Sequence, residues 1–542
     1  MNPSSVRSTA PIFLLDVSML GGRWRLATQA VSITSGLSDP DRTFHAGLTV
    51  PSVTQAIGSL GSASPTEPTA TFEGIYLDGA LDLMADGGAL IIGRGEFSAI
   101  LAGDVWERRV VLASGRVTGV RVARNDLVSF VLGETLGEDI GTLIPPTAVI
   151  DDESWPNAPD GSDGVVYPIV IGTPGVYTDT SGTTKYTAAT PAPMVDDTGG
   201  AEVLLLSLGR VSASTVRIRN AEDATGEDFN VTITTDGRGQ TVSVVSLAGA
   251  ATLTVDPEAE YHARWSGGGG LIGRSGSYMS GAGEVLLWAL SHSTIPVDLA
   301  RFEAVRGELD RYKVSGYIDD NGFSPVEWVA DNLLKLLPIS LGCLGGIYPI
   351  MQRWGQRIEQ SELILDVDAV PGELEVDDSA LEIDGSPVST FSLRYAWSIF
   401  HQAPKRTRTV SGDPAYLAQD AAAVQGHALL SVASDMARAL TGTTQTTVET
   451  IETRWVYDDV TAGLILNSYS ALRAVPNVNI TLRCSWYWLA RLRLGQIVSF
   501  SASELRITRR VCQVDSIEYG FTSGRVRLRV VADPERNRHN RS

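Results

Sequence analysis

The sequence has little lysine, histidine and cysteine, and each scarcity excludes a class of site. No lysine follows a glycine, so the Gly-Lys-Ser/Thr loop that cradles phosphate is absent. The four lysines are Lys185, Lys313, Lys335 and Lys405. The spacing of the cysteines fits neither a zinc site nor a disulfide framework, and the six histidines are scattered. We expect no metal site, no cofactor, and buried reduced thiols at Cys343, Cys484 and Cys512.

Long apolar runs and a signal-peptide pattern are also missing. The uncharged, mostly apolar stretch at residues 336–351 is short and is interrupted by prolines and glycines. Near the N-terminus, Pro11 and Asp16 interrupt a short apolar run, and no small-residue cleavage pattern follows. We expect a soluble protein of a reducing compartment with no membrane-spanning segment.

Signatures of catalysis are absent too. No serine has glycine both two residues before and two residues after it, and no HExxH occurs. The paired acids could serve as the two carboxylates of a glycosidase, but a chain with 63 acids contains such pairs by chance. These pairs are Asp151-Asp152, Asp196-Asp197, Asp319-Asp320 and Asp458-Asp459. The sequence nominates no catalytic residue, and we expect no enzyme.

Acidic residues are what the chain has in excess. Its net charge of −20 weighs against nonspecific duplex binding, which needs lysine and arginine to attract phosphate. Residues 473–542 nevertheless carry 13 arginines and five acids, a net +8. On the strand expected from Gly524, alternation places Arg525, Arg527 and Arg529 on one face. That face is either solvated or an arginine strip facing an acidic neighbour, such as another subunit.

The pattern predicts a mainly β, multi-domain chain with α+β parts, barrel-like or sandwich-like β domains and a few helices. The helices are expected at 324–337, 413–441 and 459–475. A capping box with proline at the first helical position opens the first, at Ser324-Pro325-Val326-Glu327. The clearest hairpin runs from Phe229 to Leu247 around an Asp236-Gly237 turn.

Four domains are expected. Residues 1–150 form a β-barrel-like domain whose runs include Trp106–Leu112 and Val117–Val122, closed by a short helix at Phe130–Ile144. Residues 151–290 form an inserted or appended β-rich domain. Residues 291–412 form an α+β domain, and 413–542 a helix plus β-strands. The acidic stretch 151–164 is taken as a solvated connection, since its spacing does not fit a calcium loop of the EF-hand type.

Two more patterns can be interpreted either as purely structural or as binding sites. Gly268-x-Gly270-x-x-Gly273 has the letters of a dinucleotide fingerprint, but a glycine- and serine-rich stretch follows instead of a helix, so a flexible loop is favoured. Trp455, Trp486 and Trp488 are favoured as core or interface over a sugar-stacking platform. Trp486 and Trp488 are expected on one face of a strand.

Three places resemble the central hub protein of a phage tail tip or baseplate, of the long flexible-tailed type. One is the C-terminal order of a helix at Asp459–Val475, a strand led by Pro476-Asn477-Val478, the segment Ala490–Val498 and closing strands. Tail hub proteins often have a Leu-x-Leu-Gly-Asp-x-Val segment there, and Gln496 replaces its acid. The others are Phe323-Ser-Pro-Val-Glu-Trp-Val and Tyr167-Pro-Ile-Val-Ile-Gly172.

The resemblance implies a structural virion protein of the tail tip, assembled in the host cytoplasm. Such hubs are homotrimers whose two barrel-like domains per subunit join a sixfold tail tube to a threefold tip. Residues 1–150 and 291–412 are then the ring-forming domains. Its partners are tail-tube, distal-tail and tail-fibre or tip proteins, and DNA passes without specific binding, which an acidic wall favours. The alternatives are a distal-tail or receptor-binding protein that takes carbohydrate through residues 165–290, and a cell-wall hydrolase.

Overall fold

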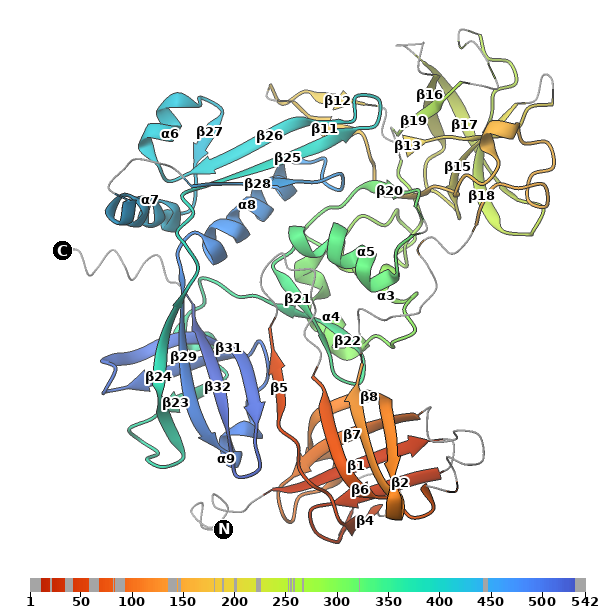
Figure 1. Ribbon diagram of the computed structural model, residues 1–542. Helices are drawn as coiled ribbons and strands as arrows, with labels where there is room; N and C mark the ends of the chain where they lie inside the picture. Colours follow the sequence, from red (N-terminus) through yellow and green to blue (C-terminus); the bar gives the residue numbers. More distant parts are fainter. Residues whose placement is uncertain are drawn as a thin grey trace. The chain divides into compact units, whose positions relative to one another are not determined.

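The computed structural model forms two compact units, which are described separately (Figure 1). Unit 1 comprises residues 1–138, 339–386 and 476–542, and unit 2 comprises 139–338 and 387–475. The chain is mainly β and multi-domain with few helices, which confirms the expected fold class. The four-domain division stays a prediction. The structure describes residues 11–19, 22–34, 42–57, 68–80, 82, 93–134, 144, 148–179, 181–187, 190–198, 202–220, 226–251, 253, 256, 259–265, 268–320, 322–441 and 447–531.

The first sheet of unit 1 has eight strands in the order β3-β4-β2-β1-β7-β8-β9-β6. It is built from short alternating runs, and its central strand β1 is buried along most of its length. The strands are β1 (Ile12–Met19), β2 (Gly22–Ala27), β3 (Val31–Ile33), β4 (Arg42–Ala46), β6 (Ala70–Tyr76), β7 (Gly93–Ile100), β8 (Val110–Ala123) and β9 (Leu127–Gly133).

The second sheet of unit 1 joins segments that lie far apart in sequence, in the order β23-β30-β31-β32-β29-β24, with β5 also paired to β31. One hydrophobic core is continuous between the two sheets, and in it the Phe13 ring meets Trp486 at 5.2 Å between centroids. The elements are β5 (Val53–Ala56), β21 (Ile339–Cys343), β22 (Ile347–Met351), β23 (Leu363–Asp366), β24 (Leu374–Asp384), β29 (Asn477–Ser485), α9 (Trp486–Leu489), β30 (Ile497–Ala502), β31 (Ile507–Tyr519) and β32 (Ser523–Val530).

Unit 2 contains a seven-stranded sheet in the order β13-β19-β16-β17-β18-β15-β14. Its hairpin pairs β17 with β18 in antiparallel register, which confirms the expected turn at Asp236-Gly237. The strands are β13 (Thr190–Pro191), β14 (Met194–Asp196), β15 (Val203–Leu208), β16 (Thr215–Asn220), β17 (Glu227–Thr235), β18 (Thr241–Ser246) and β19 (Tyr261–Trp265).

The rest of unit 2 is a four-stranded sheet, β27-β26-β25-β28, with helices and two small strand pairs, β10 with β20 and β11 with β12. The strands are β10 (Ile169–Ile171), β11 (Val176–Thr178), β12 (Thr184–Tyr186), β20 (Gly316–Ile318), β25 (Thr390–Ser398), β26 (Ala403–Ser411), β27 (Ala423–Gln425) and β28 (Val448–Glu452). The helices are α3 (Ala282–Leu290), α4 (Leu299–Leu309), α5 (Pro325–Asn332), α6 (Pro414–Gln419), α7 (Ala428–Thr441) and α8 (Asp459–Arg473).

The single helix expected at 413–441 is wrong. The chain forms α6, then β27, then α7, because residues 423–425 hydrogen-bond in parallel to the edge of β26. At Gly426 an added Cβ would lie 2.4 Å from Leu430 Cδ1, so the close approach of strand and helix requires glycine there. The other two expected helices are confirmed. Ser324 caps α5, a 3₁₀ turn extends that helix to Leu336, and Asp458 caps α8.

Three local expectations in unit 1 are also corrected. The run Phe130–Gly133 belongs to β9 rather than to a helix, and residues 135–143 of that expected helix lie outside the described residues. The strand expected at Trp106–Leu112 begins as a 3₁₀ turn, and its remainder fuses with the following run into β8. Trp486 and Trp488 lie on the short helix α9 rather than on a strand.

Candidate functional sites: a polar pocket and an arginine face

A pocket of about 490 Å³ in unit 2, here called the polar pocket, gathers acids, bases and aromatic side chains. Of the four acid pairs that the sequence offered, Asp319-Asp320 is the one that lines either of the two cavities described for this part of the chain. Asp458 instead caps α8 by accepting from Thr461 N at 2.8 Å, and Asp459 pairs with Arg406 at 3.1 Å. One of the four adjacent acid pairs in the sequence therefore lies in the polar pocket.

Aromatic side chains form one part of the polar pocket, and polar contacts fix two of them. The Trp328 and Trp455 rings meet edge to face, with centroids 5.2 Å apart. Trp455 Nε1 donates to Asn332 Oδ1 at 3.0 Å, and Asn332 Nδ2 donates to Trp328 O at 3.0 Å. The expected core role of Trp455 is confirmed by its burial. Three half-buried rings, Tyr317, Phe323 and Trp397, complete the aromatic lining.

The charged groups of the polar pocket are of both signs. Acids are Asp319, Asp320, Asp331 and Glu452, and bases are Lys335 and Arg454. Asp319 keeps solvent-exposed surface, but burial of its carboxyl group in the pocket raises its pKa despite nearby Arg454, and burial lowers the pKa of Lys335. Within the described part of the chain, Asp331 and Lys335 form no close ion pair and no side-chain hydrogen bond, although Asp331 and Glu452 attract the Lys335 ammonium. Among the same residues, the Asp319 carboxylate accepts only from its own backbone. The three groups therefore keep hydrogen-bonding positions for a ligand.

A second, mainly apolar cavity of about 580 Å³ lies where the glycine-rich segment meets α3. Gly273 borders it, but α3 begins only at Ala282, so the glycines do not sit at a helix N-terminus as a nucleotide site requires. They serve packing instead, because an added Cβ at Gly270 would lie 2.0 Å from Val170 O. The loop interpretation of this segment is confirmed.

Replacing Gly270 by alanine is expected to lower the free energy of unfolding by about 1–3 kcal/mol, because the backbone of β10 must shift to admit the methyl group. Urea unfolding of the full chain measures this loss. Gly307→Ala in α4 is the matched control, since nothing lies within 4 Å of its Cβ position. That control should be neutral or stabilising by up to about 1 kcal/mol. Equal losses in both variants would refute the packing role.

The arginine face of β32 meets acids of its own sheet. Arg525 Nε lies 3.3 Å from Asp377 Oδ2, and Arg527 Nη2 lies 3.1 Å from Glu382 Oε2. Both acids come from β24. The third arginine, Arg529, is only 8% exposed and donates to Gln513. Arg525 is still 55% exposed, so this face is partly solvated, and the acids that it meets belong to the same chain; a contact with another subunit stays a prediction.

Replacing Arg527 by alanine is expected to cost about 0.2–1 kcal/mol of stability through its pair with Glu382, which is 62% exposed. Its second, longer pair with Asp515, which is 22% exposed, adds to that cost because burial raises the pKa of Asp515. The molar mass in solution should stay unchanged. Urea unfolding and light scattering, each at low and high salt, check both statements. A change of mass would show that Arg527 contacts another subunit.

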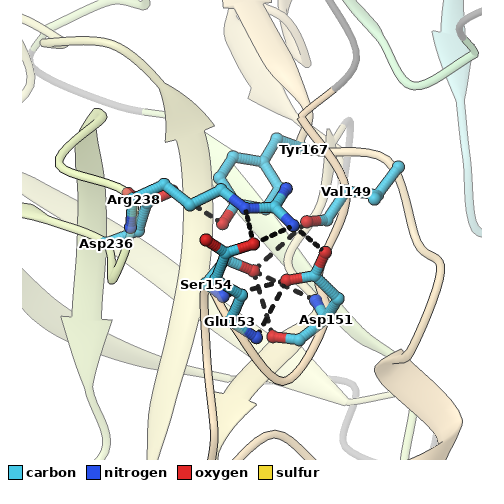
Figure 2. A network of polar contacts seen from close by, with 7 residues as sticks. All are labelled: Val149, Asp151, Glu153, Ser154, Tyr167, Asp236 and Arg238. Atoms are coloured by element: carbon cyan, nitrogen blue, oxygen red, sulfur yellow. Dashed lines mark hydrogen bonds and ion pairs between the residues drawn. The ribbon is translucent and has the colours of Figure 1, made fainter.

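The acidic segment 151–164 is packed rather than a free connection (Figure 2). Arg238, at the β17–β18 turn, pairs with Asp151 and with Glu153, the latter at 3.1 Å. Gly237 N donates to Ser154 O at 2.9 Å, and Tyr167 OH donates to Asp236 Oδ2 at 3.0 Å. Hydrogen bonds from Ser154 lower the pKa of Asp151, and burial raises the pKa of Tyr167 to about 12. This network clamps the segment to the hairpin.

Two further expectations concern the thiols and metals. All three cysteines are buried and none forms a disulfide, as predicted, and burial raises the pKa of Cys484 and of Cys512 to about 12. In the described ranges, no three or more His, Cys, Asp or Glu side chains are grouped as a metal site would need. No described helix is both long and apolar enough to cross a membrane.

Comparison with known proteins gives only remote likenesses. No family model and no curated protein matches the chain. Among solved structures it is similar to the 43 kDa tail protein of prophage MuSo2 from Shewanella oneidensis, at 8% identity over 97% of this chain and 98% of that chain, with a TM-score of 0.31. It is similar to a tail protein from Neisseria meningitidis, at 11% identity over 68% and 97%, with a TM-score of 0.26. A prophage tail protein from Listeria monocytogenes matches at 8% over 92% and 94%, with a TM-score of 0.27. TM-scores this low do not establish a shared fold.

Proposed function

We propose that the chain is a structural protein of a phage tail tip, the hub that joins the sixfold tail tube to a threefold tip. The observation that carries the proposal is how the hub-like segment Leu492–Val498 is built. Leu492 and Val498 are buried in the core of unit 1, and Gly495 turns the chain with a φ of +79°. The Gly495 carbonyl accepts from Gln513 Nε2 at 3.0 Å, so the turn is tied to β31.

The departure of this chain from the hub pattern keeps its local chemistry. Where hubs often have an acid, Gln496 Oε1 accepts from Arg493 N at 3.1 Å, as a carboxylate oxygen would. Gln496 Nε2 donates to Glu362 at 3.3 Å, a contact that an acid would replace by repulsion. The substitution therefore fits the site rather than weakening the resemblance.

The two sheets of unit 1 are the ring-forming part that we propose. Hubs use two barrel-like domains per subunit, and unit 1 has two sheets around one continuous core. The second sheet takes strands from 363–384 and 477–530, so it shares only part of the span 291–412 that the sequence favoured. In a trimer, these sheets would make a pseudo-sixfold ring facing the tail tube.

The net charge of the chain supports the proposal that it lines a channel through which DNA passes. The chain carries −20, and the arginines of β32 are paired within their own sheet, so they are not free to hold phosphate. An acidic wall repels phosphate and keeps a passing duplex mobile. The chain would act in the virion without catalysis, beside tail-tube, distal-tail and fibre or tip proteins.

Cryo-electron microscopy of the virion tail tip tests the proposal. We expect threefold density at the end of the tail tube into which unit 1 fits, with acids outnumbering arginines along the lumen. A fit at the periphery of the tip, or a lumen lined mainly by arginine, would refute the hub assignment. A peripheral place would favour the second candidate, a receptor-binding tail-tip protein, for which the polar pocket is the specific observation.

A further inference from the structure

We propose that the polar pocket binds a neutral saccharide. Its volume of about 490 Å³ lies within the ~300–1,000 Å³ typical of ligand pockets. The pocket lies outside residues 165–290, where the sequence had placed a possible carbohydrate module. Its residues come from β20 and the turn after it, from α5, from the end of β25 and from the segment after β28.

The charged groups of the pocket match hydroxyl groups, which both donate and accept hydrogen bonds. Asp319 and Asp331 are exposed carboxylates that can accept from hydroxyls, and the Lys335 ammonium can donate to them. Among the described residues, no other side chain is hydrogen-bonded to these three, and the attraction of Asp331 and Glu452 for Lys335 leaves the donors of the ammonium unused. A ligand that donates and accepts at once satisfies both kinds of group.

Ligands of a single charge fit less well. A phosphate or an acidic sugar would meet four acids against the two bases Lys335 and Arg454. A lysine or arginine side chain of a partner would find the acids, but it would leave Lys335 without an acceptor and would be repelled by it. Because the polar pocket carries charges of both signs, it favours a neutral ligand over an anion or a cation.

Aromatic faces supply the apolar half of saccharide recognition. Trp397 is half-buried, and the Arg454 guanidinium covers one face of its ring at 5.2 Å, so a ligand would pack on the part of the ring that stays open. Trp328 and Trp455 are buried and held by Asn332, which keeps the wall rigid before a ligand arrives. A pyranose ring has an apolar C–H face that packs on such an aromatic surface.

Saturation-transfer NMR on the full chain tests this binding. The probes are the methyl glycosides of glucose, galactose, mannose, rhamnose and N-acetylglucosamine at millimolar concentration, with tetralysine as the cationic competitor. We expect saturation transfer to at least one glycoside. Transfer to none of them, or binding of tetralysine alone, would overturn the proposal, and the second result would indicate a basic partner.

Variants locate the site. Asp319→Asn and Trp397→Ala should each weaken glycoside binding at least tenfold, while Trp288→Ala, a half-buried tryptophan bordering the apolar cavity, should leave it unchanged. Asp319 is exposed, so its variant keeps the fold even where the loss of Trp397 does not. Unchanged binding in Asp319→Asn and in folded Trp397→Ala would overturn the assignment. The proposal is independent of the hub function, because no part of this experiment reports on the oligomeric state.

Discussion

Replacing Gln513 by alanine is expected to lower the free energy of unfolding of unit 1 by about 3–5 kcal/mol. Gln513 is fully buried on β31. Its Nε2 donates to Met351 O at 2.7 Å and to Gly495 O at 3.0 Å. Its Oε1 accepts from Arg353 N at 3.0 Å and from the Arg529 guanidinium. One side chain thus ties three distant segments together.

The large cost follows from what alanine would leave behind. The two carbonyls would lose a buried donor, and the nearly buried Arg529 would lose its acceptor. Burial lowers the pKa of Arg529, and nearby Asp515 opposes that shift. Without Gln513 the buried guanidinium would keep Asp515 nearby but would lose its hydrogen-bond acceptor, a loss that costs more in the interior than at the surface.

Urea unfolding, together with hydrogen exchange of the β29–β32 amides, measures this effect. Gln496→Ala is the matched control, because Gln496 is only half-buried and makes exposed contacts. We expect the control to lose no more than about 1 kcal/mol. Similar losses in the two variants would show that Gln513 does not tie the sheet together.

Replacing Trp265 by alanine is expected to destabilise the seven-stranded sheet of unit 2 by about 3–5 kcal/mol. Trp265 lies on β19, is fully buried in the core of that sheet, and donates from Nε1 to Thr190 Oγ1 at 2.9 Å. Alanine would leave a cavity in a closely packed core and would remove the donor for a buried hydroxyl.

Trp265→Phe separates the two contributions, because it keeps most of the apolar volume and loses the hydrogen bond. We expect it to cost about 1–3 kcal/mol, from a smaller cavity and from the donor lost by the Thr190 hydroxyl, which still donates to Ala263 O at 3.4 Å. Ile233→Ala on β17 is the control, since Ile233 is 40% exposed. Chemical unfolding followed by hydrogen exchange in β16–β19 measures all three. A loss below 1 kcal/mol for Trp265→Ala would contradict the core assignment.

Strands and helix ends could be predicted from the sequence where neighbouring residues determine them. The alternation in β17 and β18, and the caps at Ser324 and Asp458, act within a few residues, and the structure has them. The helix α3 was missed because its cap comes from far along the chain. Glu284 N is satisfied by Asp310 Oδ1 at 2.9 Å, across 26 residues. The break between α6 and α7 likewise follows from pairing with β26.

The sheet of unit 1 that combines 363–384 with 477–530 could not be predicted. Its pairings, such as β23 with β30 in parallel, depend on tertiary packing that no short pattern encodes. The polar pocket has the same origin. Asp319-Asp320 was visible as an acid pair, whereas Lys335, Trp397 and Arg454 come from separate segments and carry no shared motif.

The measurement that tests the hub proposal most directly is the molar mass in solution, by light scattering, of the chain alone and mixed with a phage tail-tube protein. The hub proposal predicts three copies of the 57.8 kDa chain, either alone or in the mixed complex. At high salt we expect the trimer to persist, because the arginines of β32 are already paired within the chain. A single copy in both samples would contradict the proposal.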